Sequence, residues 1–197
     1  MKILSERKAE DFLEKGGFRV VERKFCSSRI GLRKSLMKIG VPFVLKASGK
    51  KLFSKENLSG VKQNVKTYTE ALIEFKNLKK IKGSKGVLIQ KKINGKEFFV
   101  GIKKESDQNF KISLGFFSSE KKEGVFKVFP SVKKRVVKIV KEFGGSLSGK
   151  EKYSLEKFIF ELIEFIKSNS KIKEIIVGSL IVDGKHSIIV NARIIFD

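Results

Sequence analysis

The sequence has one cysteine, Cys26, and one histidine, His186, among its 197 residues. A single cysteine excludes an internal disulfide bond and a cysteine-based metal site. A single histidine removes serine–histidine–aspartate catalysis and most zinc chemistry from consideration. Tryptophan is absent and only two prolines are present, so the amino-acid composition is biased.

Long apolar runs are also missing, since no apolar stretch reaches 18 residues. This excludes a transmembrane helix. The N-terminal residues Met1–Glu6 lack the apolar core of a signal peptide, so we expect a cytoplasmic protein with no membrane partner. The 41% hydrophobic content excludes a wholly disordered chain, and the length suits one compact domain or two small lobes.

Acidic residues are scarce relative to basic ones, with 21 Asp and Glu against 44 Lys and Arg and a net charge of +23. Such a charge makes nucleic acid a candidate partner. Only seven of the basic residues are arginine, the residue that best recognises base edges and phosphates in bidentate fashion. The lysines are spread along the chain, so we interpret the charge mainly as a compositional bias that brings non-specific polyanion binding.

Capping residues, apolar spacing and turn residues predict the secondary structure. Ser5 can cap a first helix that Gly16-Gly17 ends, and the pairs Asn94-Gly95 and Asp183-Gly184 predict two β-hairpins. The predicted helices cover residues 5–15, 28–39, 67–78, 131–143 and 154–168. The predicted strands cover residues 18–21, 41–45, 86–93, 97–102, 110–117, 125–129, 174–182 and 186–196, with a short strand after residue 61.

The stretch from Gly40 to Val61 has the most informative pattern in the chain. Its apolar run Val41–Leu45 predicts a buried strand that ends at Lys46, before a loop of glycine, serine and lysine. A lysine at a strand end beside a flexible loop suits nucleotide phosphates, because charge-assisted hydrogen bonds form where the backbone can approach closely. This feature alone is common, since many strands end in lysine.

The order and spacing of these residues resemble ATP-grasp domains, and most closely the β subunit of ADP-forming acetyl-CoA synthetase, a relative of succinyl-CoA synthetase. In that family the lysine is followed at the same distance by His-Lys and Gly-Gly-Val. Here those positions hold Ser54-Lys55 and Ser59-Gly60-Val61. The resemblance implies an α+β ATP-grasp fold, with an N-terminal lobe at 1–85, a C-terminal lobe at 86–197 and a nucleotide cleft between them.

A second matching segment covers the strand that the resemblance expects at the hinge between the two lobes. The family pattern Val-Leu-Val-Gln-Glu-Met, then Gly-x-Glu, corresponds to Val87–Gln90 and Gly95–Glu97, with Lys91 in place of the hinge glutamate. The resemblance implies that adenine lies on the hinge backbone and that Glu97 contacts the ribose hydroxyls. The residues themselves also fit an ordinary hairpin strand in which Glu97 forms a surface ion pair.

The sequence departs from the family where the resemblance expects Mg²⁺ ligands. The family segment Glu-Leu-Asp-Ile-Asn-Pro corresponds to Glu174–Ser179, so that Ile176 replaces the aspartate and Gly178 replaces the asparagine. Asn191 replaces the aspartate of Asp-Ala-Arg-Ile, and Lys127 replaces an arginine. Because Mg²⁺ needs oxygen ligands, we expect no protein metal site and a weak contribution of Mg²⁺ to nucleotide binding.

The resemblance therefore implies ATP or ADP as the ligand and a CoA-binding α subunit, with a phosphorylated histidine, as the partner. Three functional hypotheses follow: a subunit of an NDP-forming acyl-CoA synthetase, a non-catalytic ATP-grasp scaffold, and a basic nucleic-acid-associated protein. The implied nucleotide-binding residues are Lys46, Lys55, Gln90, Lys91, Glu97 and Lys127.

Overall fold

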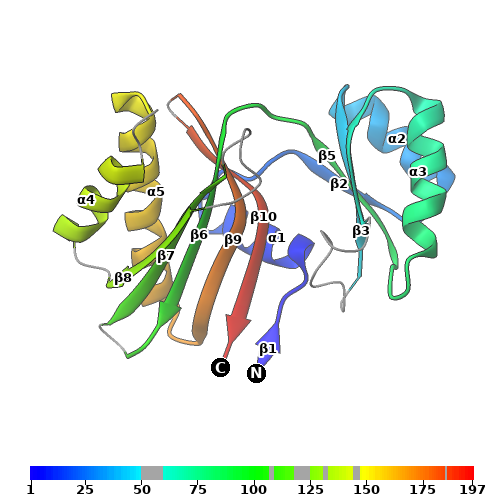
Figure 1. The fold of residues 1–197 in the computed structure, drawn as a ribbon. Coiled ribbons are helices and arrows are strands. Elements are labelled where there is room, and N and C mark those ends of the chain that lie inside the picture. The colour runs from blue at the N-terminus through cyan, green and yellow to red at the C-terminus, as the bar shows by residue number, and fades with distance from the viewer. Residues whose placement is uncertain (50–59, 107–108, 118–124, 131–132, 144–146, 185) are drawn as a thin grey trace. The chain divides into compact units, whose positions relative to one another are not determined.

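The structure is a computed structural model of mixed α+β class, as the sequence predicts, and it divides into two compact units (Figure 1). The larger unit contains residues 1–4, 8–20 and 94–197, and the smaller unit contains residues 5–7 and 21–93. The described residues are 1–49, 60–106, 109–117, 125–130, 133–143, 147–184 and 186–197.

The smaller unit has a four-stranded sheet in the order β2-β5-β3-β4, whose neighbours pair antiparallel. Two helices, α2 and α3, cover one face of this sheet (Figure 1). Ser28 and Thr67 cap them, each accepting a backbone N–H from the first turn of its helix. The elements are β2 (Arg23–Cys26), α2 (Arg29–Ile39), β3 (Phe43–Ser48), β4 (Val61–Val65), α3 (Tyr68–Lys80) and β5 (Gly86–Lys91).

Strand alternation decides which side chains of the smaller sheet meet the helices. Phe43, Leu45 and Ala47 of β3 lie in a core with residues of α2 and α3, together with Val87 and Ile89 of β5. The residues between them point to the opposite face, which we call the second face of the smaller sheet. Its side chains in β3 and β5 belong to Val44, Lys46, Ser48, Leu88 and Gln90.

The larger unit has a six-stranded sheet in the order β1-β10-β9-β6-β7-β8. Helices α4 and α5 lie on one side of this sheet, and their apolar side chains share a core with alternate residues of the strands (Figure 1). Helix α1 joins this core through Ala9 and Leu13. The elements are β1 (Lys2–Ile3), α1 (Glu6–Lys15), β6 (Lys96–Lys104), β7 (Phe110–Phe117), β8 (Val125–Pro130), α4 (Lys133–Phe143), α5 (Gly149–Ser168), β9 (Ile172–Asp183) and β10 (His186–Phe196).

The structure corrects two strand predictions. The predicted hairpin at Asn94-Gly95 is wrong, because β5 pairs with β2 and β3 whereas β6 pairs with β7 and β9. The predicted strand at 18–21 is reduced to one bridge between Val20 and Ile189, and the strand forms instead at Arg23–Cys26. The second predicted hairpin is confirmed, since β9 and β10 pair antiparallel across Asp183-Gly184.

The pairing of β5 also determines where along the chain the smaller unit ends and the larger unit begins. Residues 86–93 belong to the smaller unit, whereas the sequence pattern suggests that the C-terminal lobe begins at residue 86. Residues 8–20 belong to the larger unit through the core contacts of α1. Among the described residues, no helix is both long and apolar enough to cross a membrane.

Candidate functional site

Lys46 and Gln90 lie together on the second face of the smaller sheet. In the register of β3 and β5, Gln90 is opposite Val44, and Lys46 is opposite Leu88, so the two side chains are diagonal neighbours. Both are buried, Gln90 completely and Lys46 with 5% of its surface exposed. The structure thus brings together the strand-end lysine and the hinge glutamine that the resemblance assigned to one nucleotide.

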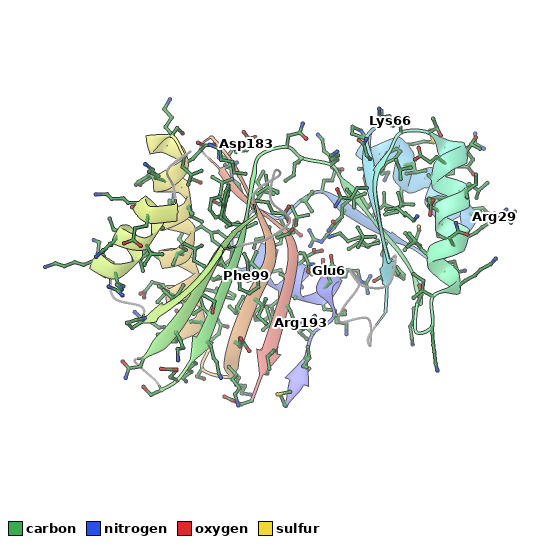
Figure 2. The ribbon with its side chains drawn as sticks, viewed as in Figure 1. Glu6, Arg29, Lys66, Phe99, Asp183 and Arg193 are labelled. Carbon is green, nitrogen blue, oxygen red and sulfur yellow. The ribbon has the colours of Figure 1, made fainter. Side chains whose placement is uncertain are left out.

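The ammonium group of Lys46 has a carboxylate partner that the sequence analysis did not identify. Lys46 Nζ donates a hydrogen bond to Glu6 Oε1 at 2.9 Å, and the side chains are 7% and 8% exposed. Glu6 is the first residue of α1 (Figure 2). A buried ammonium requires such a partner, because its transfer from water without compensation is costly. No sequence signal links two residues 40 positions apart.

The hinge backbone beside Gln90 is partly engaged within the smaller unit. The Lys91 N–H donates to the Glu22 carbonyl at 3.0 Å, and the Lys92 N–H donates to the Pro42 carbonyl at 3.1 Å. A backbone N–H donates at full strength to only one acceptor. An adenine base on this segment would therefore hydrogen-bond to a backbone carbonyl or to the N–H of a later residue. The Lys91 side chain is exposed.

Glu97 lies in the larger unit, on β6, where its side chain points away from the helix-packed core. Phe98, Val100 and Ile102 face that core, so Glu97, Phe99 and Gly101 point to the opposite face, the second face of the larger sheet. Ser179 of β9 donates a hydrogen bond from Oγ to Glu97 Oε1. This contact gives Glu97 a partner other than a surface lysine and fixes the orientation of its carboxylate.

The positions where the resemblance expects metal ligands lie on the same second face. Ile175 and Val177 enter the core, so Glu174, Ile176 and Gly178 point the other way, as alternation predicts. A Cβ added to Gly178 would lie 3.6 Å from Asn191 Nδ2, so the Asn191 amide is beside this position. Among the positions Glu174, Ile176, Gly178 and Asn191, side-chain oxygens belong only to Glu174 and Asn191. Glu174 is opposite Lys103 in the strand register.

An alkyl group and a glycine stand at two of these positions, and neither offers Mg²⁺ a side-chain oxygen. Arg193, on β10, is opposite Ile176 and brings a cation to the same row (Figure 2). Within the described ranges, no group of three or more His, Cys, Asp and Glu residues is arranged to hold a metal ion.

Two predicted lysines remain, Lys127 and Lys55. Lys127 is opposite Leu114 in the β7–β8 pairing, which places its backbone on the larger sheet. Lys55 lies outside the described residues. The prediction that Lys46, Lys55, Gln90 and Glu97 face one cleft stays a prediction.

Cys26 is not a candidate nucleophile in this arrangement. Its side chain is in the core of the smaller unit, with 3% of the residue exposed. Burial raises the pKa of the Cys26 thiol to about 11, although the nearby Lys79 ammonium lowers it in part. At neutral pH the thiolate that attacks electrophiles is therefore scarcely populated.

The two sheets with their covering helices agree with the α+β fold that the resemblance to ATP-grasp domains predicts. The chain belongs to this family, since the sequence model of the ATP-grasp domain matches residues 1–115 of its 197.

The proteins similar to this chain include ADP-forming acetyl-CoA synthetases. The ADP-forming acetate–CoA ligase II of Archaeoglobus fulgidus is 29% identical over 148 residues, which are 73% of this chain and 22% of the relative. This chain therefore spans about a fifth of that relative's length.

Solved structures share the fold at lower identity. The dinucleotide-forming acetyl-coenzyme A synthetase 1 of Candidatus Korarchaeum cryptofilum, in complex with coenzyme A and Ca-AMPCP, is similar with a TM-score of 0.83 and 20% identity. The match covers 100% of this chain and 94% of that one. A Pyrococcus horikoshii protein has a TM-score of 0.82 and 20% identity, with 99% and 92% of the two chains covered.

Proposed function

We propose that this chain binds ATP or ADP and is the ATP-grasp part of an ADP-forming acyl-CoA synthetase-like complex. The observation that carries this proposal is the juxtaposition of Lys46 and Gln90 on neighbouring strands of the smaller sheet. Family membership supports the proposal, because these residues match the family's segments in order and spacing.

Each implied residue has a role that its chemistry allows. Lys46 supplies positive charge to the phosphates, with Lys55 and Lys127 as further cations. The hinge at Gln90 and Lys91 offers backbone carbonyls to the adenine amino group. Glu97, oriented by Ser179, accepts hydrogen bonds from the ribose hydroxyls. Mg²⁺ contributes little to binding in this proposal, since Ile176 and Gly178 cannot ligate it.

The full reaction in this proposal needs a partner. A CoA-binding subunit would present a phosphohistidine, whose phosphoryl group moves to the terminal phosphate oxygen of ADP to give ATP and free histidine. The name of the Archaeoglobus relative and its much greater length support this assignment. Phosphoryl transfer depends on cations that neutralise charge in the transition state, so the isolated chain should transfer phosphate very slowly.

A second candidate is a nucleotide-binding scaffold without catalysis. The apolar Ile176 and the glycine at 178 favour it, because they remove the main electrostatic contribution to phosphoryl transfer at these positions. The two candidates differ in one outcome: ATP formation from ADP by the complex with its partner supports the first, and binding without turnover supports the second.

Isothermal titration with ATP, ADP and adenosine, with and without Mg²⁺, tests the shared step of both candidates. We expect ATP and ADP to bind more tightly than adenosine, with less than about a threefold gain from Mg²⁺. Lys46→Met should weaken ATP binding about tenfold or more and leave adenosine binding unchanged, because it removes a charge-assisted contact.

Two controls make this titration specific. Lys34→Met removes an exposed lysine from α2, a helix that packs on the other face of the smaller sheet, and should leave ATP affinity unchanged. The double variant Glu6→Gln/Lys46→Met avoids a buried carboxylate without its cation and should retain the ATP defect. Equal affinity of the native chain for ATP and adenosine would contradict the role of Lys46.

A further inference from the structure

The ion pair between Lys46 and Glu6 puts an internal anion where the proposed function places a phosphate. Lys46 Nζ is 2.9 Å from Glu6 Oε1, a hydrogen-bond distance, and both side chains are more than nine-tenths buried. A phosphate oxygen bound to the same ammonium would lie within about 5 Å of the carboxylate, given the tetrahedral arrangement of the N–H bonds. Two anions at that separation in a poorly solvated place repel each other strongly.

We propose that Glu6 competes with nucleotide phosphate for Lys46, so that a phosphate-bearing ligand binds by displacing this carboxylate. The inference rests on the proposed nucleotide function and adds a specificity-determining residue to the same site. Every phosphate-bearing ligand must break the same ion pair to reach Lys46, whereas adenosine need not. Glu6 therefore lowers the affinity for ATP, ADP and AMP but not the affinity for adenosine.

The position of Glu6 allows the displacement without unfolding of the helix. Glu6 is the first residue of α1, where free backbone N–H groups and the helix dipole stabilise a carboxylate after it leaves Lys46. The start of α1 has a second attachment to the smaller unit, since the Arg7 guanidinium lies 4.9 Å from the centroid of the Phe25 ring. The carboxylate can therefore move while the beginning of the helix stays attached.

The variant Glu6→Gln tests the competition because it keeps the size and hydrogen-bonding capacity of the side chain but removes its charge. We expect its affinity for ATP to rise about tenfold and its affinity for AMP to rise as well. Its affinity for adenosine should stay within about twofold of the native value, because adenosine has no phosphate. A purely structural role of Glu6 would change adenosine and ATP binding together.

Glu74→Gln is the matched control for the charge change. Glu74, on α3, is in the same unit and forms an ion pair of 3.6 Å with Lys62, but on the helix-covered side. This variant should leave the affinities for ATP, AMP and adenosine unchanged. An equal rise in ATP affinity for Glu74→Gln would assign the effect to net charge and overturn the proposal.

A measurement on the native chain needs no variant. The carboxyl carbon of Glu6, assigned by triple-resonance NMR, should shift when ATP or inorganic pyrophosphate is added and stay unchanged with adenosine. An unmoved Glu6 resonance at saturating ATP overturns the proposal, and so does a loss of ATP affinity in Glu6→Gln. If the native chain binds neither ATP nor adenosine, the proposed nucleotide function fails first and this inference falls with it.

Discussion

Ile176 and Gly178 leave two positions on the second face of the larger sheet without a side-chain oxygen. In the strand register Ile176 lies between Gly101 and Arg193, so its row contains an alkyl group and a cation. Asn191 is the neighbour of Gly178, and its amide has a single oxygen. Under the proposed function, we therefore expect a nucleotide on this face to gain little from Mg²⁺.

The double substitution Ile176→Asp/Gly178→Asn should create magnesium dependence. A side chain at 178 meets Asn191 at ordinary contact distance, so the substitution fits the backbone and adds an amide oxygen. We expect Mg²⁺ to tighten ATP binding about tenfold in this variant, as titration with and without Mg²⁺ would measure. Ile176→Asn/Gly178→Asn, which has the same bulk as the test variant but no carboxylate, is the control. Strong magnesium dependence in the native chain would mean that other residues form the metal site.

Helix α5 begins with a capping box that also contacts β6. Ser148 Oγ accepts the Glu151 N–H at 3.3 Å, and Glu151 Oε2 accepts the Ser148 N–H at 2.7 Å. Lys96 Nζ donates to the same Glu151 oxygen at 3.1 Å. The Ser148 N–H, with smaller contributions from the Ser148 hydroxyl and Lys96, lowers the pKa of the Glu151 carboxyl below its usual 4.5.

Glu151→Gln should therefore destabilise the protein in a pH-dependent way. The pKa is lower in the folded protein, so the ionised carboxylate stabilises the fold above pH 4.5, and this contribution disappears as pH falls through the folded-state pKa. We expect a decrease of about 1 kcal/mol in the free energy of unfolding at pH 7, measured by urea denaturation. The difference from the native protein should shrink at about pH 3. Glu164→Gln, an exposed acid at the other end of α5, should show no such decrease.

The helices are the elements that local sequence predicts best, because their ends depend on nearby residues. Ser28 and Thr67 cap α2 and α3 at the expected places. The predicted start of α5 at residue 154 is wrong, since the helix begins at Gly149. The Ser148–Glu151 capping box, a local signal that the sequence does contain, sets this earlier start.

Strand partners and the ion pair of Lys46 could not be derived from local patterns. Asn94-Gly95 has the composition of a hairpin turn, yet the strands on either side join different sheets. Glu6 and Lys46 are 40 residues apart and come from a helix and a strand whose contact depends on the tertiary fold. The family resemblance supplied the α+β fold, because it compares the order of several segments at once, but it did not supply side-chain partners in this chain.

The net charge of +23 is distributed over helices of both units. Helix α2 has the basic residues Arg29, Arg33, Lys34 and Lys38 and no acidic residue. Helix α4, in the larger unit, has five basic residues and one acidic residue over Lys133–Phe143. We expect such a distribution to attract polyanions, and most of its cations are lysines rather than the arginines that favour base recognition.

Binding to DNA or RNA should therefore be salt-sensitive and independent of sequence. Each phosphate neutralised by a lysine releases counterions, so the logarithm of the association constant should fall linearly with the logarithm of salt concentration. At any one salt concentration, duplexes of unrelated sequence should bind with the same affinity in fluorescence anisotropy, since phosphate contacts do not distinguish bases.

Replacing Arg33, Lys34 and Lys38 of α2 together by glutamine tests the contribution of this helix. The slope of the salt dependence should become shallower by about 0.9 for each phosphate that the variant no longer neutralises. The same variant should keep its ATP affinity, because the proposed phosphate contact, Lys46, lies on the other face of the smaller sheet. A duplex that is still preferred at high salt would contradict this prediction and favour a nucleic-acid function over the proposed nucleotide site.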